Sequence, residues 1–139
     1  MRDEIVVIFA GYPEKMEGFL LKNPGLRSRI GFHVPFPDYT PGELYEILEL
    51  LAKDNRMKLA DGVRERVYPF IEKSTGVKEF GNGRYARNLL ERARMRQAAR
   101  LIRMEPSNVT EQVAATLIAE DFEEIRLSTA PSAKRVGFI

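Results

Sequence analysis

Two short runs of apolar residues near the start of the chain predict β-strands. Residues 5–10 form a continuous run of mainly β-branched and aromatic side chains, which is typical of a strand covered on both faces in a parallel sheet. Between Phe32 and Phe36 apolar residues alternate with others, and Pro35 predicts an edge position for this second strand because proline cannot donate to the ladder. Both strands need neighbours, and we expect them to pair with each other or with another copy of the chain.

A short helix is predicted between these two strands. Pro13 suits the first position of a helix, residues 14–21 continue it, and the sequence Asn23-Pro24-Gly25 ends it. The loop that follows carries two arginines, Arg27 and Arg29.

The pattern changes from strand-like to helical at residues 37–41. Thr40 and Glu43 have the T-x-x-E spacing of a capping box, with Pro41 at the first helical position. The predicted division is an α/β part at residues 1–39, a helical part at residues 40–127 and a tail at residues 128–139.

Apolar residues at helical spacing predict three amphipathic helices in the helical part. The first carries Leu44, Ile47, Leu48 and Leu51, and the second carries Val63, Val67, Phe70 and Ile71. The third begins after Gly81-Asn82-Gly83 and runs to about Met104. One face carries Ala86, Leu89, Leu90, Ala93, Leu101 and Met104, and another carries Met95, Ala98 and Ile102. We therefore expect the third helix to pack on both flanks. A small fourth helix is predicted up to about Leu127.

The composition is that of an ordinary globular protein. The 139 residues include 22 Lys and Arg, 20 Asp and Glu and no cysteine, with a net charge of +2. The absence of cysteine excludes disulfides, thiolate zinc sites and cysteine nucleophiles, and it is compatible with a cytoplasmic location. The longest apolar run, residues 5–10, is far short of the roughly 20 residues of a membrane span. Asp3 and Glu4 argue against a secretory signal, so we expect a cytoplasmic protein without a membrane partner.

Four segments together resemble the C-terminal half of an AAA+ ATPase module. They read VVIFAGYPEKM, NPGLRSRI, FPDY and EFGNGRYARNLLERARMRQA, in that order. Among AAA+ proteins they are most similar to stage V sporulation protein K and to the red-type, CbbX-like rubisco activases, over nearly all of residues 3–125. The resemblance implies a mainly α chain with a small α/β stub: a helical lid subdomain preceded by the last two strands of a parallel αβα sheet.

The resemblance also implies roles for five residues. The loop after the first helix would carry the arginine finger, which is Arg29 or alternatively Arg27. Arg84 matches the sensor 2 arginine that reaches from the lid to phosphate, and Arg87 either shares this role or is a surface charge. At the end of the sensor 1 strand many AAA+ proteins have Asn or Thr, whereas Tyr12 stands here as a nucleotide-site candidate or a packed ring.

The groups that grip a nucleotide are missing from this sequence. It contains no G-x-x-x-x-G-K-[ST] phosphate loop, and no apolar strand ending in Asp-Glu precedes Ile5. We expect ATP and Mg to act in a full-length protein and neither to bind tightly to this chain, which should be inactive alone. The family implies a self-assembled ring, a hexamer by expectation, that uses ATP hydrolysis to remodel an unknown protein substrate.

A stand-alone helical module for protein interaction, without ATPase activity, is the alternative function. The arginines of the third helix, Arg92, Arg94, Arg96, Arg100 and Arg103, are expected to form a solvated face or a subunit contact. A nucleic-acid partner is not expected, because Glu91 lies on the same helix and no aromatic residues interleave with the arginines. His33 has no companion for catalysis or metal binding nearby in sequence, so it is expected to be structural, and no metal site is predicted.

Overall fold

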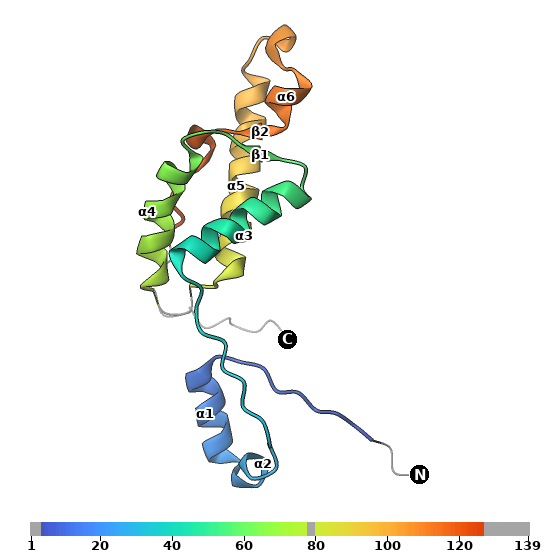
Figure 1. Ribbon diagram of the computed structural model, residues 1–139, viewed down its shortest axis with the longest axis vertical. Coiled ribbons are helices and arrows are strands. Elements are labelled where there is room, and N and C mark those ends of the chain that lie inside the picture. Colours follow the sequence, from blue (N-terminus) through green and yellow to red (C-terminus); the bar gives the residue numbers. More distant parts are fainter. Residues whose placement is uncertain (1–3, 78–79, 127–139) are drawn as a thin grey trace, which may run out of the picture. The chain divides into compact units, whose positions relative to one another are not determined.

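The computed structural model describes residues 4–77 and 80–126 of the chain. The chain divides into two compact units, Met1–Pro37 and Asp38–Ile139. Helices are the main regular structure of the described residues, which confirms the predicted mainly α class (Figure 1). Within the described ranges, no helix is both long enough and apolar enough to cross a membrane.

The first unit contains helices α1, Pro13–Lys22, and α2, Pro24–Arg27. Each helix starts with a proline, whose fixed φ angle and missing N–H suit the first position of a helix. The predicted short helix is therefore confirmed, and the predicted arginine loop begins with the additional helical turn of α2. Leu20 is the buried residue of α1, and the ring of Phe19 lies 5.9 Å from the ring of Phe9, measured between centroids.

The two strands predicted in the first unit are not formed in the described chain. Residues 4–12 and 30–40 have no regular secondary structure, and Figure 1 draws both as extended chain. Their apolar side chains face solvent, with exposed fractions of 84% for Ile8 and 90% for Phe32. A strand is stable only when neighbouring strands satisfy its backbone and cover its faces, and neither segment pairs with the other here. The prediction of strand pairing within the chain is therefore wrong.

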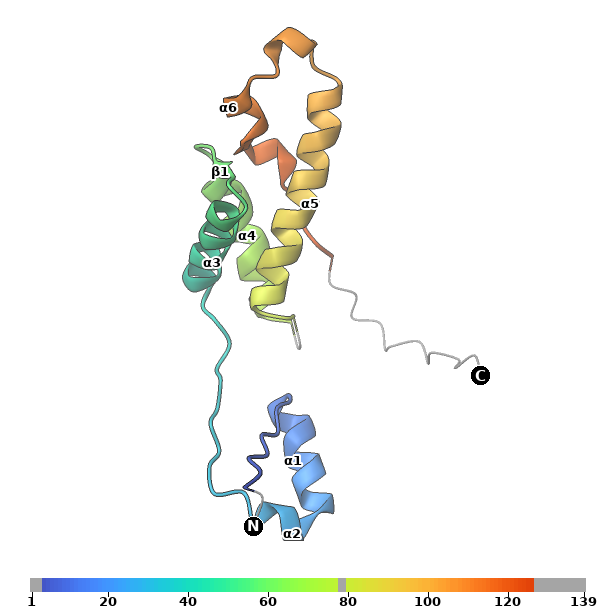
Figure 2. The same ribbon diagram turned by 90° about the vertical axis from the view of Figure 1, so that its right-hand side faces the viewer.

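The second unit contains three long helices, α3 (Pro41–Asp54), α4 (Val63–Thr75) and α5 (Gly83–Ile102). Helix α3 packs against both α4 and α5, and Figures 1 and 2 show the three helices together. The predicted capping box is present, since the Thr40 hydroxyl accepts from the Glu43 N–H and the Glu43 carboxylate accepts from the Thr40 N–H. The largest fully buried side chains of the core are Tyr85, Phe122, Leu44, Leu48, Ile71 and Leu89. The predicted amphipathic helices thus pack around one core.

The chain after α5 differs from the predicted fourth helix. It forms a 3₁₀ turn η1 (Pro106–Asn108), a short helix α6 (Glu111–Ala114), strand β2 (Thr116–Leu117) and a second 3₁₀ turn η2 (Ala119–Asp121). Strand β2 pairs in parallel with β1, Lys58–Leu59, with Lys58 opposite Thr116. Leu117 and Phe122 fill the core from this segment. Leu127 and the predicted tail lie outside the described residues.

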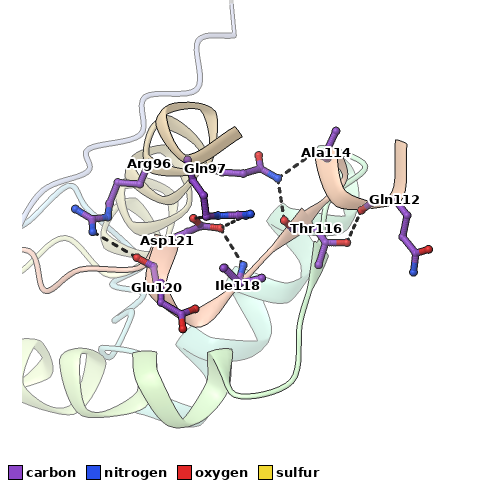
Figure 3. A network of polar contacts seen from close by, with 9 residues as sticks. Arg96, Gln97, Gln112, Ala114, Thr116, Ile118, Glu120 and Asp121 are labelled. Carbon is purple, nitrogen blue, oxygen red and sulfur yellow. Dashed lines mark hydrogen bonds and ion pairs between the residues drawn. The ribbon is translucent and has the colours of Figure 1, made fainter. Parts of the chain in front are cut away.

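Polar contacts fasten this C-terminal segment to α5, as Figure 3 shows. The buried Gln97 amide donates to the carbonyl oxygens of Ala114, at 2.9 Å, and Thr116, at 2.8 Å. The buried Asp121 carboxylate accepts from the Ile118 N–H at 2.9 Å and from two guanidinium nitrogens of Arg100. Buried polar groups need such partners, so α5 holds a segment that has little regular structure of its own.

The second apolar flank predicted for α5 is exposed. Met95 and Ile102 have exposed fractions of 73% and 84%, and Ala98 is also exposed. On the predicted first face, Ala86, Leu89, Leu90 and Ala93 are buried and Leu101 and Met104 are half-buried. The described residues place α3, β2 and η2 against one side of α5, so the prediction of packing on both flanks is wrong for this chain.

Candidate functional site

Arg84 lies in the first turn of α5, immediately after a tight turn. The Arg84 N–H donates to the Gly81 carbonyl at 2.9 Å, which closes a four-residue turn from Gly81 to Arg84. Gly81 has φ 99°, and Asn82 has φ 48° and ψ −117°, the conformation of the second residue of a type II′ turn. The two glycines let the chain reverse direction here, so α5 begins abruptly and Arg84 sits at its exposed end.

The exposed end of α5 is chemically suited to an anion. Arg84 and Arg87 are both exposed, and their i, i+3 spacing makes them neighbours on the helix surface. The first turn of α5 carries no acidic side chain. The N-terminus of a helix carries partial positive charge, and guanidinium groups match phosphate oxygens in geometry.

The phenol of Tyr85 anchors the same turn to the core. Tyr85 is almost fully buried, its hydroxyl donates to the Phe70 carbonyl at 3.1 Å, and its ring meets Phe80 edge-on with a centroid distance of 6.1 Å. Burial raises the pKa of Tyr85, and a side-chain hydrogen bond with Ser74 partly opposes this shift. The phenol therefore stays protonated as a donor, and it fixes the helix residue next to Arg84.

Asn82 has a role that the sequence analysis missed. Its side-chain nitrogen donates to Asp38 Oδ1 at 2.6 Å, and its side-chain oxygen accepts from the Tyr39 N–H at 2.8 Å. This amide ties the start of α5 to the first residues of the second unit. The signal in the sequence is an asparagine between two glycines, but its partners are more than 40 positions away and no local pattern names them.

The two candidate finger residues lie together at the end of the first unit's helices. Arg27 is the last residue of α2. Arg29 follows two residues later in a turn, and the Arg29 N–H donates to the Leu26 carbonyl at 3.0 Å. Both side chains are exposed. The structure thus brings Arg27 and Arg29 into one turn, and Arg84 and Arg87 belong to the other unit.

Tyr12 does not end a strand, because the expected sensor 1 strand is not formed. It is the N-cap residue of α1, and its carbonyl accepts from the Met16 N–H at 2.8 Å. The residue is 45% exposed, and the Lys15 Nζ lies 5.4 Å from the ring centroid. Tyr12 is therefore not fully packed, and its role as a nucleotide contact stays a prediction.

No group of three or more His, Asp or Glu side chains gathers as a metal site within residues 4–77 and 80–126. His33 is exposed on the extended segment after α2. Three arginines of the predicted stripe contact other parts of the second unit: Arg94 donates to Asn55, Arg96 pairs with Glu123, and Arg100 pairs with Asp121. These contacts favour a structural role for this stripe, and the expected absence of a nucleic-acid partner stays a prediction.

Comparison with known proteins agrees with this architecture. Residues 40–132 match the AAA lid domain family, which is more than half of the chain. A CfxQ homolog from Cyanidium caldarium is 41% identical over 91% of this chain and 44% of its own length. A chloroplastic ribulose bisphosphate carboxylase/oxygenase activase from Cyanidioschyzon merolae is 39% identical over 91% of this chain and 43% of its own. The protein CbbX from Cereibacter sphaeroides is 37% identical over 91% of this chain and 41% of its own length.

The chain therefore spans less than half the length of these curated relatives. None of the three carries the name stage V sporulation protein K, so that part of the resemblance stays a prediction. A cytoplasmic location also stays a prediction, since one of the three is named as chloroplastic. With the predicted helical lid found in the structure, the chain belongs to the AAA lid domain family and is a CbbX-like portion of an AAA+ protein.

Proposed function

We propose that this chain is the sensor and lid portion of an AAA+ ATPase, which couples ATP hydrolysis to the remodelling of a protein substrate within a ring of identical subunits. The observation that carries the proposal is the exposed Arg84 at the start of a 20-residue helix, set there by a tight glycine turn. In this proposal Arg84 contacts the phosphates of ATP, and Arg87 is either a second contact or a surface charge.

The position of Arg84 supports a role in anion binding. A cation at a helix N-terminus opposes the helix dipole, at a cost of about 0.3 to 1 kcal/mol, so helix stability alone does not favour arginine there. A bound phosphate would reverse this balance, because it would accept hydrogen bonds from the Arg84 guanidinium and its negative charge would be favoured at the helix N-terminus. Movement of α5 would then follow the presence of the γ-phosphate.

In this proposal Arg29 is the arginine finger, and Arg27 is the alternative. Both side chains are exposed beside α2, so either could reach a nucleotide held by a neighbouring subunit. An arginine supplied in this way stabilises the charge on the transferring phosphoryl group and is worth roughly 10³ to 10⁵ in rate. Tyr12 is retained as a candidate nucleotide contact at the start of α1.

The phosphate loop and the magnesium-holding groups are proposed to come from polypeptide outside this sequence. Magnesium supplies charge neutralisation on the β- and γ-phosphates when it is bound with ATP. The residues of this chain would orient the nucleotide and sense it, and the chain alone is expected to be inactive. The exposed apolar segments at residues 4–12 and 30–37 are then surfaces for other strands, from the same protein or from another copy of the chain.

A chimeric protein tests the proposal. It joins the part of Cereibacter sphaeroides CbbX that this chain does not match, where we expect the phosphate loop, to this chain. Arg84→Ala should raise the KM for ATP about tenfold or more, since a hydrogen bond to a charged group is worth about 1.5 to 3 kcal/mol. Arg92→Ala, on an exposed site further along α5, is the matched control. An unchanged KM in Arg84→Ala, with the chimera active, would contradict the sensor role.

A stand-alone interaction module remains the second candidate function. It is favoured by one observation: every residue of the buried core cluster belongs to the second unit, so this unit has a core of its own. Absence of ATPase activity in a folded chimera, together with partner binding by the second unit alone, would favour this alternative.

A further inference from the structure

Asn82 adopts a backbone conformation that glycine, not asparagine, would adopt without strain. Its φ of 48° and ψ of −117° place it at the second position of a type II′ turn, where glycine is the usual residue. Glycine stands on both sides of it, at positions 81 and 83. Asparagine has a cost in backbone strain here that glycine would avoid, and its side-chain hydrogen bonds offset this cost.

The Asn82 amide uses both of its ends. The nitrogen donates to Asp38 Oδ1 at 2.6 Å and the oxygen accepts from the Tyr39 N–H at 2.8 Å. The Asn82 backbone carbonyl meanwhile accepts from the Tyr85 N–H at 2.9 Å within the first turn of α5. One residue thus joins the segment 38–39 to the helix turn that carries Arg84.

The segment on the other side of this contact is also fixed. Thr40 follows Tyr39 directly, and its N–H donates to the Glu43 carboxylate at 2.8 Å in the capping box of α3. Hydrogen bonds therefore fix the chain from Asp38 to Glu43, between its contact with Asn82 and the start of α3. Helix α3 in turn packs against α5 in the core. The starts of α3 and α5 are connected through Asn82.

We propose that Asn82 is a positioning residue for Arg84: its amide fastens the segment Asp38–Tyr39 to the first turn of α5 and so holds Arg84 where it can meet a phosphate. This inference rests on the proposed function for the part that concerns phosphate. The fastening itself is independent of any nucleotide, so the two parts are tested separately.

The first experiment measures the fastening in this chain. In Asn82→Gly the turn keeps its favoured conformation while the amide is lost, so the core should remain folded. Hydrogen exchange followed by NMR should show the Tyr39 amide exchanging about 2- to 10-fold faster, the loss of one hydrogen bond. Asn55→Ala is the matched control, because Asn55 also links α3 to α5, through Arg94, but at the far end of α3. An unchanged exchange rate of the Tyr39 amide in Asn82→Gly would overturn this inference and leave the proposed function untouched.

The second experiment measures positioning in the chimera described above. Asn82→Gly should raise the KM for ATP about 2- to 10-fold with little change in kcat, whereas Asn55→Ala should leave the KM unchanged. The double variant Asp38→Asn with Asn82→Asp exchanges the two side chains, so an amide still donates to a carboxylate. Its KM for ATP should return to that of the parent chimera. If Arg84→Ala raises the KM and Asn82→Gly does not, the positioning role is overturned. If neither raises it, the proposed function falls together with the positioning role, whatever the Tyr39 amide shows.

Discussion

Arg100 binds the carboxylate of Asp121 through two parallel hydrogen bonds, from Nε to Oδ1 and from Nη2 to Oδ2, each 2.9 Å long. The Asp121 side chain is 2% exposed and the Arg100 side chain 26% exposed. The hydrogen bonds that Arg100 donates to Asp121 raise the pKa of Arg100, so its guanidinium stays charged in the folded chain. This pair, 21 residues apart in sequence, sets where the chain after α6 meets α5.

Removing the Asp121 carboxylate should destabilise the second unit. Asp121→Ala leaves the Arg100 guanidinium and the Ile118 N–H without their partner, and we expect a loss of about 2 to 3 kcal/mol in the free energy of unfolding. Urea denaturation followed by circular dichroism measures this. Glu123→Ala is the matched control, since Glu123 forms an exposed ion pair with Arg96 that should contribute about 0.5 kcal/mol or less. Equal losses in the free energy of unfolding for the two variants would show that the buried Arg100–Asp121 pair does not hold this segment to α5.

The Gln97 amide should be required for the placement of β2. Gln97→Leu fits the same buried space but leaves the carbonyls of Ala114 and Thr116 without a donor, so we expect a loss of about 1 to 3 kcal/mol. Thermal unfolding measures the loss. Gln112→Leu, at an exposed position on α6, serves as the comparison, and a similar loss there would contradict the explanation.

The capping box of α3 should make stability depend on pH through Glu43. Hydrogen bonds from the Thr40 backbone and hydroxyl lower the pKa of Glu43 below its ordinary value of 4.5. A carboxylate with a lowered folded-state pKa stabilises the fold above the ordinary value, and this contribution is lost as the pH falls through the lower folded value. Acid unfolding of Glu43→Gln should therefore show a weaker pH dependence than the parent chain in this range. Identical acid profiles would contradict the role of the box.

Mixing experiments should identify the arginine finger. In the chimera with CbbX, Arg29→Ala should lower the ATPase rate by about 10³-fold or more, because a finger acts on a nucleotide in the neighbouring subunit. Mixed with subunits that lack a functional phosphate loop but keep Arg29, the variant should regain activity. Arg27→Ala is measured in parallel, and a larger loss there would assign the finger to Arg27 instead.

The second unit should fold without the first. Deletion of residues 1–37 removes no residue of the core cluster, so the melting temperature should change by no more than about 2 °C. The deletion also removes the exposed apolar side chains of residues 5–9 and 32–36, and it should reduce self-association at high concentration. Differential scanning calorimetry and light scattering measure the two effects. A large fall in melting temperature would show that the first unit supports the core.

Local patterns in the sequence predicted α1, α3, α4 and α5, but not the short elements that follow α5. The capping box at Thr40, the prolines at the starts of α1 and α3, and the apolar spacing of α3 and α4 each act within a few residues. The same kind of pattern failed at residues 5–10, because a strand depends on partners and not on its own sequence alone. The exposed Met95 and Ile102 show a related error, since spacing indicates a face but not what covers it.

The sequence by itself determined the main helices of the second unit, and its resemblance to AAA+ proteins identified the helical lid and Arg84 as a candidate. Only the tertiary structure decided how β1 meets β2, where Gln97 and Asp121 bind, and that Asn82 joins Asp38 and Tyr39 to the start of α5. Helices satisfy their backbone groups within one turn, so their signals are local. These other contacts join residues up to 58 positions apart, and they form only when the packed core brings both partners together.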